Sequence, residues 1–314
     1  MTVAQASLSV DKKTLWKRIK DNWYVYMFIL PGLIYLIVFS YVPMYGITLA
    51  FKEFFIRQGI LGSPWIGLAN FKNVFNDNEF PYVFFNTIRM GLLYVISYFP
   101  CPIMLALLLN ELMAIKFKKV LQTIFTFPNF LSWVILSGVF SGFLSAYGLI
   151  NTLLVTLDIP KFSFMTNEQL IRPIMYITNI WKNAGWSSII YLAAITSIDP
   201  TYYEAARVDG ANRFHQMWYI TLPMIRSTAV ILLVLSMGGI MTMGFDQIFN
   251  MTNPVVRRQT EIIDTYIYRR TFQSNAGVDY GFSTAVGLFK SVINFILLMC
   301  ANQAAKLLGE GGIF

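Results

Sequence analysis

Six long apolar stretches, separated by polar loops, dominate the sequence. They cover residues 24–50, 84–109, 120–144, 171–196, 224–245 and 282–304. Each is long enough for the roughly 20 residues that a helix needs to cross a bilayer. The pattern therefore predicts an all-α polytopic membrane protein with six transmembrane helices.

Prolines interrupt several of these stretches. Pro31 and the turn-forming segment 43–46 predict a kinked first helix, because proline removes a backbone hydrogen bond and clashes with the preceding turn. Pro100 and Pro102 are expected to distort the second helix. The first stretch is far longer than the roughly 7–15 apolar residues of a signal-peptide core and lacks a small-residue cleavage site. We therefore expect it to remain as a spanning helix.

The composition also indicates a membrane environment. Hydrophobic residues make up 56% of the 314 residues and charged residues only 13%. An ordinary globular chain has about a quarter charged residues, so a soluble protein is excluded and the lipid bilayer is an expected partner. The net charge is +8, but the basic residues lie mostly between apolar stretches, as topology signals do. No nucleic-acid partner is expected.

The distribution of basic residues predicts the topology. They gather in three segments, 1–23, 110–119 and 197–223. These segments are expected to be cytoplasmic, which places both termini in the cytoplasm. The loop after the fifth stretch departs from this rule with four arginines, Arg257, Arg258, Arg269 and Arg270. The earlier spans usually set the orientation, so we predict a cytoplasmic segment 1–23 followed by a single transmembrane domain over 24–314.

Several kinds of chemistry have no residues to carry them. His215 is the single histidine, and Cys101 and Cys300 lie in separate apolar stretches, so no metal site is expected. The Gly-Lys-Ser/Thr signature of a phosphate-binding loop does not occur, which argues against ATP hydrolysis by that route. A membrane-embedded enzyme would need a cluster of carboxylates, histidines or metal ligands, and none is evident. We expect a chain that is not an enzyme and binds no cofactor itself.

The segment 197–223 has clear local physics. Asp199 suits a helix N-cap and Pro200 the first helical position. Gly210 can adopt the left-handed conformation that ends a helix, and a second short helix then leads to Pro223. This predicts a helix–turn–helix elbow at the cytoplasmic surface. The simpler alternative is a short interfacial linker.

The spacing in this segment favours the elbow. It matches, position by position, Glu204, Ala205, Ala206, Asp209, Gly210, Ile220, Leu222 and Pro223. This pattern resembles the EAA loop of permease subunits in bacterial ATP-binding-cassette (ABC) importers. Segments 28–35, 41–46, 67–71, 263–268 and 284–291 resemble the sugar-importer branch, especially LplB-like and alginate-type permeases for oligo- and polysaccharides.

The resemblance implies the type I ABC importer permease fold in a bacterial cytoplasmic (inner) membrane. It also implies three kinds of protein partner: a second six-span permease, two ABC ATPase subunits that bind ATP and Mg²⁺, and an extracytoplasmic sugar-binding protein. The EAA helix of such permeases docks in a groove of the ATPase. Ala205 and Ala206 would allow close docking, Glu204 would offer a charge at the interface, and Gly210 would set the angle of the elbow.

Polar residues within apolar stretches are costly and are candidates for the sugar path. The candidates are Lys182, Asn183, Trp186, Asp246, Gln247, Lys290 and Asn294. In the fourth stretch, the lysine and asparagine could face an aqueous cavity and Trp186 could stack on a sugar ring. The alternatives are a snorkelling lysine, an interfacial tryptophan belt and hydrogen bonds between helices.

Two other transport functions remain open. A secondary transporter driven by an ion gradient would need acidic groups in the membrane, and no Asp or Glu lies near the centre of a predicted span. An ABC permease for another solute, such as glycerol phosphate, would carry the same elbow. The sequence therefore favours an ABC permease for an oligosaccharide or polysaccharide.

Overall fold

The computed structural model describes residues 20–273, 279–307 and 309. Most of the predicted segment 1–23 thus lies outside the described residues. The first half of the chain forms α2 (Trp23–Leu36), η1 (Ile37–Tyr41), α3 (Val42–Met44), η2 (Tyr45–Phe51), α4 (Gly59–Gly62), α5 (Ala69–Asn76), α6 (Phe80–Tyr98), α7 (Pro100–Asn110), α8 (Ile115–Thr126), η3 (Phe127–Phe130), α9 (Trp133–Leu144) and α10 (Leu149–Thr156).

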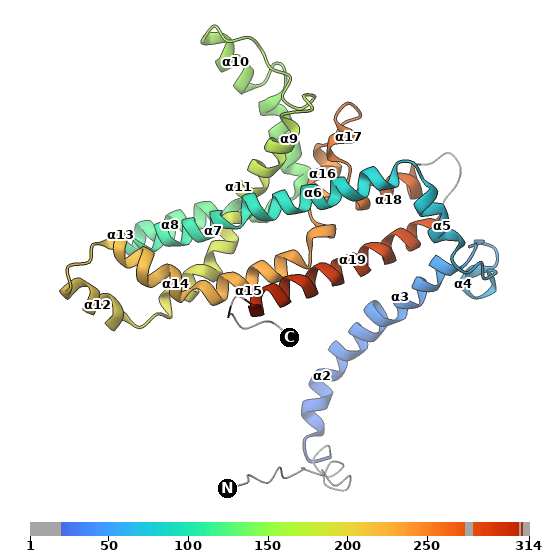
Figure 1. Cartoon of the computed structure of the whole chain (residues 1–314), viewed down its shortest axis with the longest axis horizontal. Helices are drawn as coiled ribbons and strands as arrows, with labels where there is room; N and C mark the ends of the chain where they lie inside the picture. Colours follow the sequence, from blue (N-terminus) through green and yellow to red (C-terminus); the bar gives the residue numbers. More distant parts are fainter. Residues whose placement is uncertain (1–19, 274–278, 308, 310–314) are drawn as a thin grey trace.

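The second half forms α11 (Ile171–Thr196), α12 (Pro200–Val208), α13 (Arg213–Gln216), η4 (Met217–Thr221), α14 (Leu222–Met224), α15 (Arg226–Met237), η5 (Ile240–Thr242), α16 (Phe245–Met251), α17 (Arg257–Thr260), α18 (Ile263–Phe272) and α19 (Tyr280–Leu307). Helices α6, α7, α15 and α19 run along the long axis of the molecule (Figure 1). Helix α11 packs against α6, α7 and α8.

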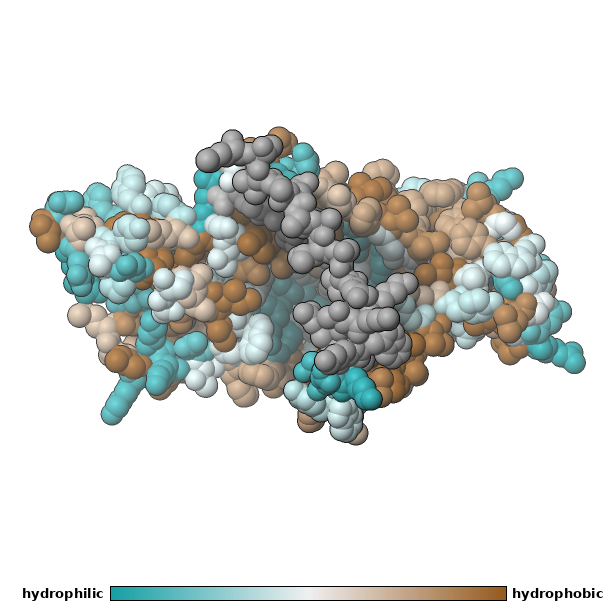
Figure 2. All heavy atoms as spheres, turned by 90° about the horizontal axis from the view of Figure 1, so that it is seen from below, coloured by the Kyte–Doolittle hydropathy of each residue, from teal (hydrophilic) through white to brown (hydrophobic). Residues whose placement is uncertain are grey.

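The bundle has two distinct ends. We call the end that carries α12 and α13 the elbow end, and the end that carries α4, α5 and α18 the loop end (Figure 1). Helices α9 and α10 project from the side of the bundle. Figure 2 shows hydrophilic residues gathered at both ends of the face seen from below. This distribution is expected of a bundle that crosses a bilayer along its long axis.

Four helices in the described part of the chain are long and apolar enough to cross a membrane, namely Trp23–Phe51, Phe80–Asn110, Trp133–Thr156 and Tyr280–Leu307. The pair Arg213–Met224 and Arg226–Met237, bent by 56°, counts as a fifth if it is one span. Helix α11 matches the predicted stretch 171–196 residue for residue but does not meet the same criterion of apolarity. Six spans therefore stays a prediction.

The predicted third span, 120–144, is wrong as one helix. Helix α8 ends at Thr126, a 3₁₀ turn follows, and Leu131 and Ser132 are extended before α9 begins at Trp133. Pro128 cannot donate a backbone hydrogen bond, and the Ser132 hydroxyl accepts one from the Ile135 amide, which starts a new helix. The predicted fifth span, 224–245, is also interrupted, because α15 ends at Met237.

Two prolines are accommodated by widening the helix before them. Pro43 follows the π-helical turn Ile37–Tyr41, and Pro223 follows the π-helical turn Met217–Thr221. A wider turn relieves the clash between the proline ring and the preceding carbonyl. The other prolines disturb the chain less. Pro31 lies inside α2, and the prolines at 100 and 102 are preceded by a one-residue interruption at Phe99.

The apolar core consists of three clusters along the bundle. The cluster at the loop end includes Phe80, Tyr266 and Phe282, and the next lies between α6, α11 and α16. The third joins α7, α11 and α15 near the elbow end. The first helix stands apart, since none of the 18-residue apolar window in Trp23–Phe51 is buried. The helix contacts the rest of the chain mainly through η2, which packs against α19.

Candidate coupling elbow and central cavity

The first half of the elbow forms as the local sequence predicts. The Asp199 carboxylate accepts a hydrogen bond of 2.9 Å from the Thr201 amide and caps α12, with Pro200 at the first helical position. This hydrogen bond from the backbone lowers the pKa of Asp199 below its ordinary value. Gly210 ends the helix at φ = +81°. The left-handed conformation is open to glycine without strain, so the chain can reverse there.

The second half of the elbow is tied back to the first. The Asn212 side chain caps α13 by accepting from the His215 amide at 2.9 Å. The Tyr203 and Thr221 hydroxyls, on the two sides of the turn, share a hydrogen bond of 2.9 Å. This bond holds α12 against the π-helical turn at Thr221. The elbow is thus a braced unit and not a loose linker.

The elbow is also attached to the end of α7. The Arg213 guanidinium lies 3.6 Å from the Glu111 carboxylate and donates to the Glu111 carbonyl at 3.2 Å. It also contacts the Met113 sulfur at 3.2 Å. An exposed ion pair alone contributes little free energy, but three contacts from one guanidinium fix its position. The Arg213 contacts therefore join the elbow to the end of α7.

The structure places the motif residues at the tip and on the return of the elbow. Glu204, Ala205, Asp209 and Gly210 are exposed, and Ala206 is half-buried. On the return helix, Ile220 and Leu222 are half-buried and Pro223 is exposed. Large apolar side chains are exposed beside them, including Val208 at 88%, Phe214 at 64% and Tyr219 at 71%. A surface of this kind is typical of a docking site for another protein.

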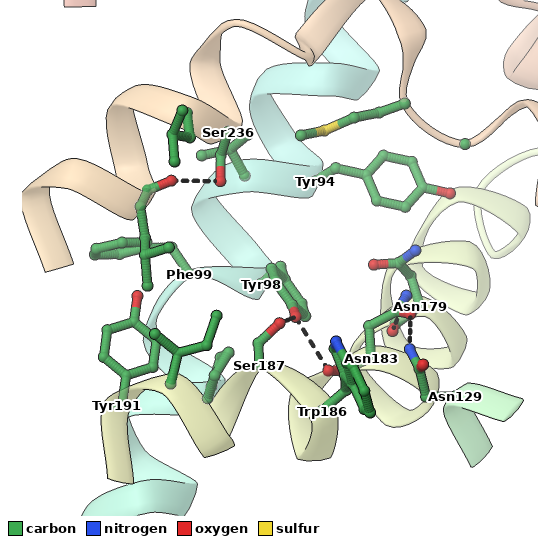
Figure 3. A pocket seen from close by; sticks show the side chains of 17 residues that line it. Tyr94, Tyr98, Phe99, Asn129, Asn179, Asn183, Trp186, Ser187, Tyr191 and Ser236 are labelled. Carbon is green, nitrogen blue, oxygen red and sulfur yellow. Dashed lines mark hydrogen bonds between the residues drawn. The ribbon is translucent and has the colours of Figure 1, made fainter. Parts of the chain in front are cut away.

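A cavity of about 500 Å³ lies between α6, α7, α11 and α15. This is within the range of small-molecule sites, about 300–1,000 Å³. Figure 3 shows its polar and aromatic wall, to which Asn183 and Trp186 contribute as predicted. The wall also includes Tyr94, Tyr98, Phe99, Asn129, Asn179, Ser187, Tyr191 and Ser236.

Hydrogen bonds order the polar wall of this cavity. The Tyr98 hydroxyl donates to the Ser187 hydroxyl and lies 3.1 Å from the Asn183 carbonyl. The Asn129 amide donates to the Asn183 side-chain oxygen at 3.1 Å, and Asn183 in turn donates to the Asn179 carbonyl at 3.1 Å (Figure 3). Amides, hydroxyls and aromatic faces are the groups that suit a polyhydroxylated ring.

Lys182 does not face this cavity, which corrects the expectation for that residue. Its side chain is buried, and its ammonium donates to the carbonyls of Pro128, Asn129 and Leu131 at 3.3, 2.8 and 2.6 Å. These carbonyls lie at the break between α8 and α9, where regular helical hydrogen bonding is interrupted; the Pro128 carbonyl also accepts from the Leu131 amide at 3.2 Å. Lys182 therefore stabilises the break, and a sugar contact is no longer proposed for it.

The other candidates lie away from the cavity. The Lys290 ammonium pairs with Asp264, and the Asn294 side chain accepts from the Met241 amide at 3.0 Å. Asp246 is exposed outside the cavity wall. Gln247 is fully buried and accepts a 2.6 Å hydrogen bond from Tyr94, which does line the cavity. Only Gln247 therefore connects to the cavity, and it does so indirectly.

Several cavity residues were not singled out from the sequence. Tyr94, Tyr98 and Tyr191 lie in apolar stretches, where aromatic residues are expected as core or interface residues. Ser187 and Asn179 carry a usable signal, because with Asn183 they follow helical spacing on one face of α11. Asn129 could not be found from spacing, because it reaches the cavity wall from the interruption between helices α8 and α9.

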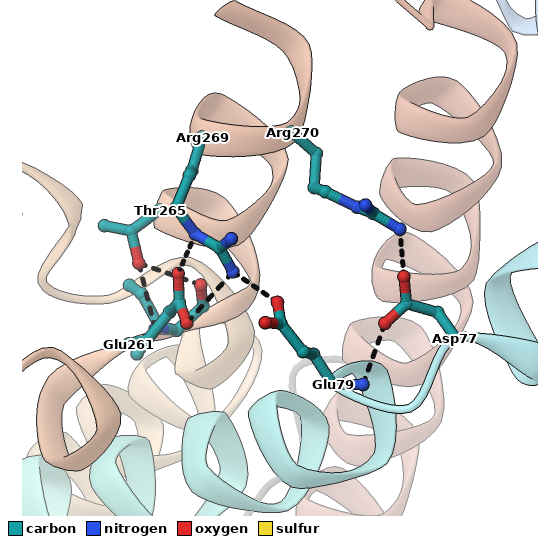
Figure 4. A network of polar contacts seen from close by, with 7 residues as sticks. Asp77, Glu79, Glu261, Thr265, Arg269 and Arg270 are labelled. Carbon is teal, nitrogen blue, oxygen red and sulfur yellow. Dashed lines mark hydrogen bonds and ion pairs between the residues drawn. The ribbon is translucent and has the colours of Figure 1, made fainter. Parts of the chain in front are cut away.

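The arginines that depart from the topology rule are partly neutralised. Arg269 pairs with Glu79 at 2.6 Å and Glu261 at 2.7 Å, and Arg270 pairs with Asp77 (Figure 4). Burial alone would lower the pKa of Arg269, but the hydrogen bonds that its guanidinium donates to the two carboxylates, together with their negative charges, raise it above its ordinary value. These ion pairs fasten α18 to the start of α6. Their charges therefore serve the structure of the loop end.

The described residues form a helical bundle with an exposed elbow at one end and, in its middle, a cavity that carries several hydrogen-bonding side chains (Figure 1). This arrangement fits a subunit of a membrane transport system. A family model for the binding-protein-dependent transport system inner membrane component matches residues 79–306. The chain belongs to this family. It is therefore a transmembrane, non-catalytic permease subunit of an ABC importer, with the type I permease fold and no cofactor of its own.

Individual relatives narrow the comparison. The polygalacturonan/rhamnogalacturonan permease YteP of Bacillus subtilis is 45% identical and covers 96% of this chain and 94% of its own length. LplB of the same organism is 40% identical, covering 94% and 92%. A chain of a bacterial alginate ABC transporter, in complex with alginate pentasaccharide-bound periplasmic protein, matches with a TM-score of 0.86 at 37% identity, covering 95% and 99%.

Proposed function

We propose that this chain imports an acidic oligosaccharide, received from a binding protein, through the central cavity. The single observation that carries the proposal is the braced elbow joined to α7, because α7 also forms part of the cavity wall through Pro102. A push on the elbow can thus reach the substrate path directly. Asn183 and Trp186 are the proposed sugar contacts, through a side-chain amide and an indole face.

The acidic substrate is proposed from the relatives. One is named for polygalacturonan and rhamnogalacturonan, and a solved relative, 38% identical with a TM-score of 0.85, imports the acidic polysaccharide alginate. Each of these polysaccharides contains sugar acids. The amides and hydroxyls that line the cavity can form hydrogen bonds with the hydroxyl groups of a sugar chain.

Two ATPase subunits, which bind ATP and Mg²⁺, are proposed to supply the motion. The exposed apolar side chains beside the motif can be buried against an ATPase subunit. The Glu204 carboxylate at the tip offers a charge that can fix how the two proteins align. Docking there requires the elbow to be in the cytoplasm. We therefore propose that the elbow end is inner, that the loop end is outer and that both termini are cytoplasmic.

A second six-span permease is the proposed neighbour of the first helix. The helix Trp23–Phe51 is highly apolar, yet none of its 18-residue apolar window is buried in this chain. Lipid alone could surround it, but the helix leaves the bundle at a wide angle and contacts it mainly through η2 and α19 (Figure 1). A helix held out in this way is well placed to pack on a partner subunit.

The decisive test reverses the charge at the elbow. We expect Glu204→Lys to reduce ATP-driven uptake in proteoliposomes by about tenfold or more, since one interfacial charge pair is worth about 1.5 kcal/mol or more. ATPase subunits should co-purify less well. Glu53→Lys, an equally exposed reversal at the loop end, is the matched control and should change neither.

Three outcomes would contradict the proposal. Full uptake by a variant that combines Glu204→Lys with Gly210→Pro would show that the elbow is not the coupling element. Uptake by this chain alone, driven by an ion gradient and without ATPase subunits, would show a secondary transporter. Failure of the complete wild-type importer to take up acidic oligosaccharides, together with uptake of neutral ones, would refute the substrate class.

A further inference from the structure

An arginine without a partner lies well inside the second long helix. Arg89 is the tenth residue of the 31-residue helix Phe80–Asn110, and it is exposed. Within the described residues it makes no hydrogen bond or ion pair, unlike Arg172, Arg269 and Arg270. The function of the elbow and the central cavity does not use this charge. It therefore needs an explanation of its own.

The depth of Arg89 argues against simple contact with lipid. The helix is about 45 Å long at 1.5 Å per residue, so about 15 Å of it extends beyond a 30 Å hydrocarbon layer. With the helix centred, Arg89 lies a few ångströms inside the outer boundary of that layer. An arginine facing hydrocarbon there is costly, and such residues usually face water or a ligand.

Arg89 does face a cavity. A pocket of about 390 Å³ is formed by Arg89 and Leu93 on α6, by the start of α11 and by Gln259. Arg172 lies in the same pocket, where it donates to the Gln259 carbonyl at 2.8 Å and to the Asn86 side-chain oxygen at 2.7 Å. Arg172 is therefore fixed by neutral acceptors and keeps its positive charge uncompensated.

The remaining groups leave the pocket with one net positive charge. Glu168 is the one acidic residue among the lining residues, and its carboxylate accepts from the Gln259 amide at 3.1 Å. The Tyr176 hydroxyl lies buried with no hydrogen-bond partner in the described residues. A net charge of +1 suits a single carboxylate better than a phosphate ester, which carries nearly two negative charges.

The pocket lies on the same face of α11 as the central cavity. Arg172 and Tyr176 line the pocket, and Asn179, Asn183 and Trp186 line the cavity, at steps of three or four residues. Residues at this spacing share one side of a helix. The ring of Tyr176 meets the ring of Tyr94, a cavity residue, edge to face at 5.0 Å. The Tyr94–Tyr176 contact therefore joins a residue that lines the cavity to a residue that lines the pocket.

We propose that Arg89 and Arg172 bind the carboxylate of a sugar acid as an acidic oligosaccharide enters from the outside. This inference rests on the proposed function for its orientation and its substrate class. Arg89 has both edges of its guanidinium free for the two carboxylate oxygens, a geometry that lysine cannot reproduce. The pocket would then select charged sugars before they reach the uncharged wall of the cavity.

The test uses the complete importer in proteoliposomes, with a trimer of galacturonic acid and its fully methyl-esterified form as probes. Loss of one charge-assisted hydrogen bond, about 1.5–3 kcal/mol, corresponds to at least tenfold. Binding is measured on the permease–ATPase assembly with the binding protein left out. There we expect Arg89→Gln to weaken binding of the acid about tenfold and to leave the affinity for the ester unchanged. Arg89→Lys should restore only part of the affinity. Arg57→Gln, an exposed arginine in the loop after the first helix, is the matched control.

The outcomes separate this inference from the proposed function. Equal weakening of acid and ester by Arg89→Gln, or none, would overturn the inference while uptake of the acid by the wild type still supports the function. Loss of the partner permease or of binding-protein docking in Arg89→Gln would show that Arg89 pairs with an acidic residue of a partner, which also overturns it. Absence of acid uptake by the wild type would refute the function itself.

Discussion

Substitution of Gly185 by alanine is expected to force two helices apart beside the cavity. A Cβ atom at Gly185 would lie 2.0 Å from the Phe125 carbonyl oxygen and 2.3 Å from its carbon, where ordinary contacts begin at 3.4 Å. These atoms are backbone, so no side chain can turn away. Helix α8 would have to move by more than an ångström, and overpacking of this kind costs about 1–3 kcal/mol or more.

The shift would also reach the cavity. Phe125 is four residues before Asn129, whose amide bonds to Asn183, so moving α8 pulls this contact apart. We expect Gly185→Ala to lower the melting temperature of the purified complex by several degrees and to reduce uptake. Gly287→Ala on α19, where a Cβ would meet nothing within 4 Å, is the matched control. Wild-type stability and uptake in Gly185→Ala would refute the close contact of α8 with α11.

Two further predictions concern Lys182 and Asp199. Lys182→Met should destabilise the complex by about 1–3 kcal/mol or more, because it leaves buried carbonyls at the α8–α9 break without a donor; an unchanged melting temperature would show that water replaces the ammonium. Asp199→Ala should speed hydrogen exchange of the Thr201 amide. Because the pKa of Asp199 is lowered in the folded chain, its cap is complete above the ordinary carboxyl pKa and is lost as pH falls through the folded value. Exchange of this amide in the wild type should therefore stay constant from pH 5 to 8, after correction for the intrinsic rate, and a step in that range would contradict the assignment of the cap to Asp199.

The elbow could be predicted in detail because its determinants are local. The helix cap at Asp199, the proline after it and the glycine at position 210 each depend only on neighbouring residues, and all three adopt the expected local structure. The long apolar helices were also found, since hydropathy over 20 residues is a strong signal. Physical properties of short segments therefore sufficed for these elements.

The break in the predicted third span could not be read in the same way. Its carbonyls are satisfied by Lys182, more than fifty residues further along the chain. In the linear sequence, that lysine in an apolar stretch looks the same whether it faces a cavity or holds a break. Tyr98 lines the cavity, but the sequence did not single it out. Nothing in an apolar stretch distinguishes a tyrosine that lines a cavity from one that packs in the core. Both cases depend on contacts between distant segments.

Helices α6 and α7 together form a single shaft that is anchored at both ends of the bundle. One end, at Glu111, is joined to Arg213, and the residue before the other end, Glu79, is joined to Arg269. If a shaft about 45 Å long tilts by 10° about its midpoint, its tips travel about 4 Å in opposite directions. That distance is enough to separate an ion pair. Loosening of the Glu79–Arg269 contact and displacement of the Glu111–Arg213 contact would then follow from one and the same tilt.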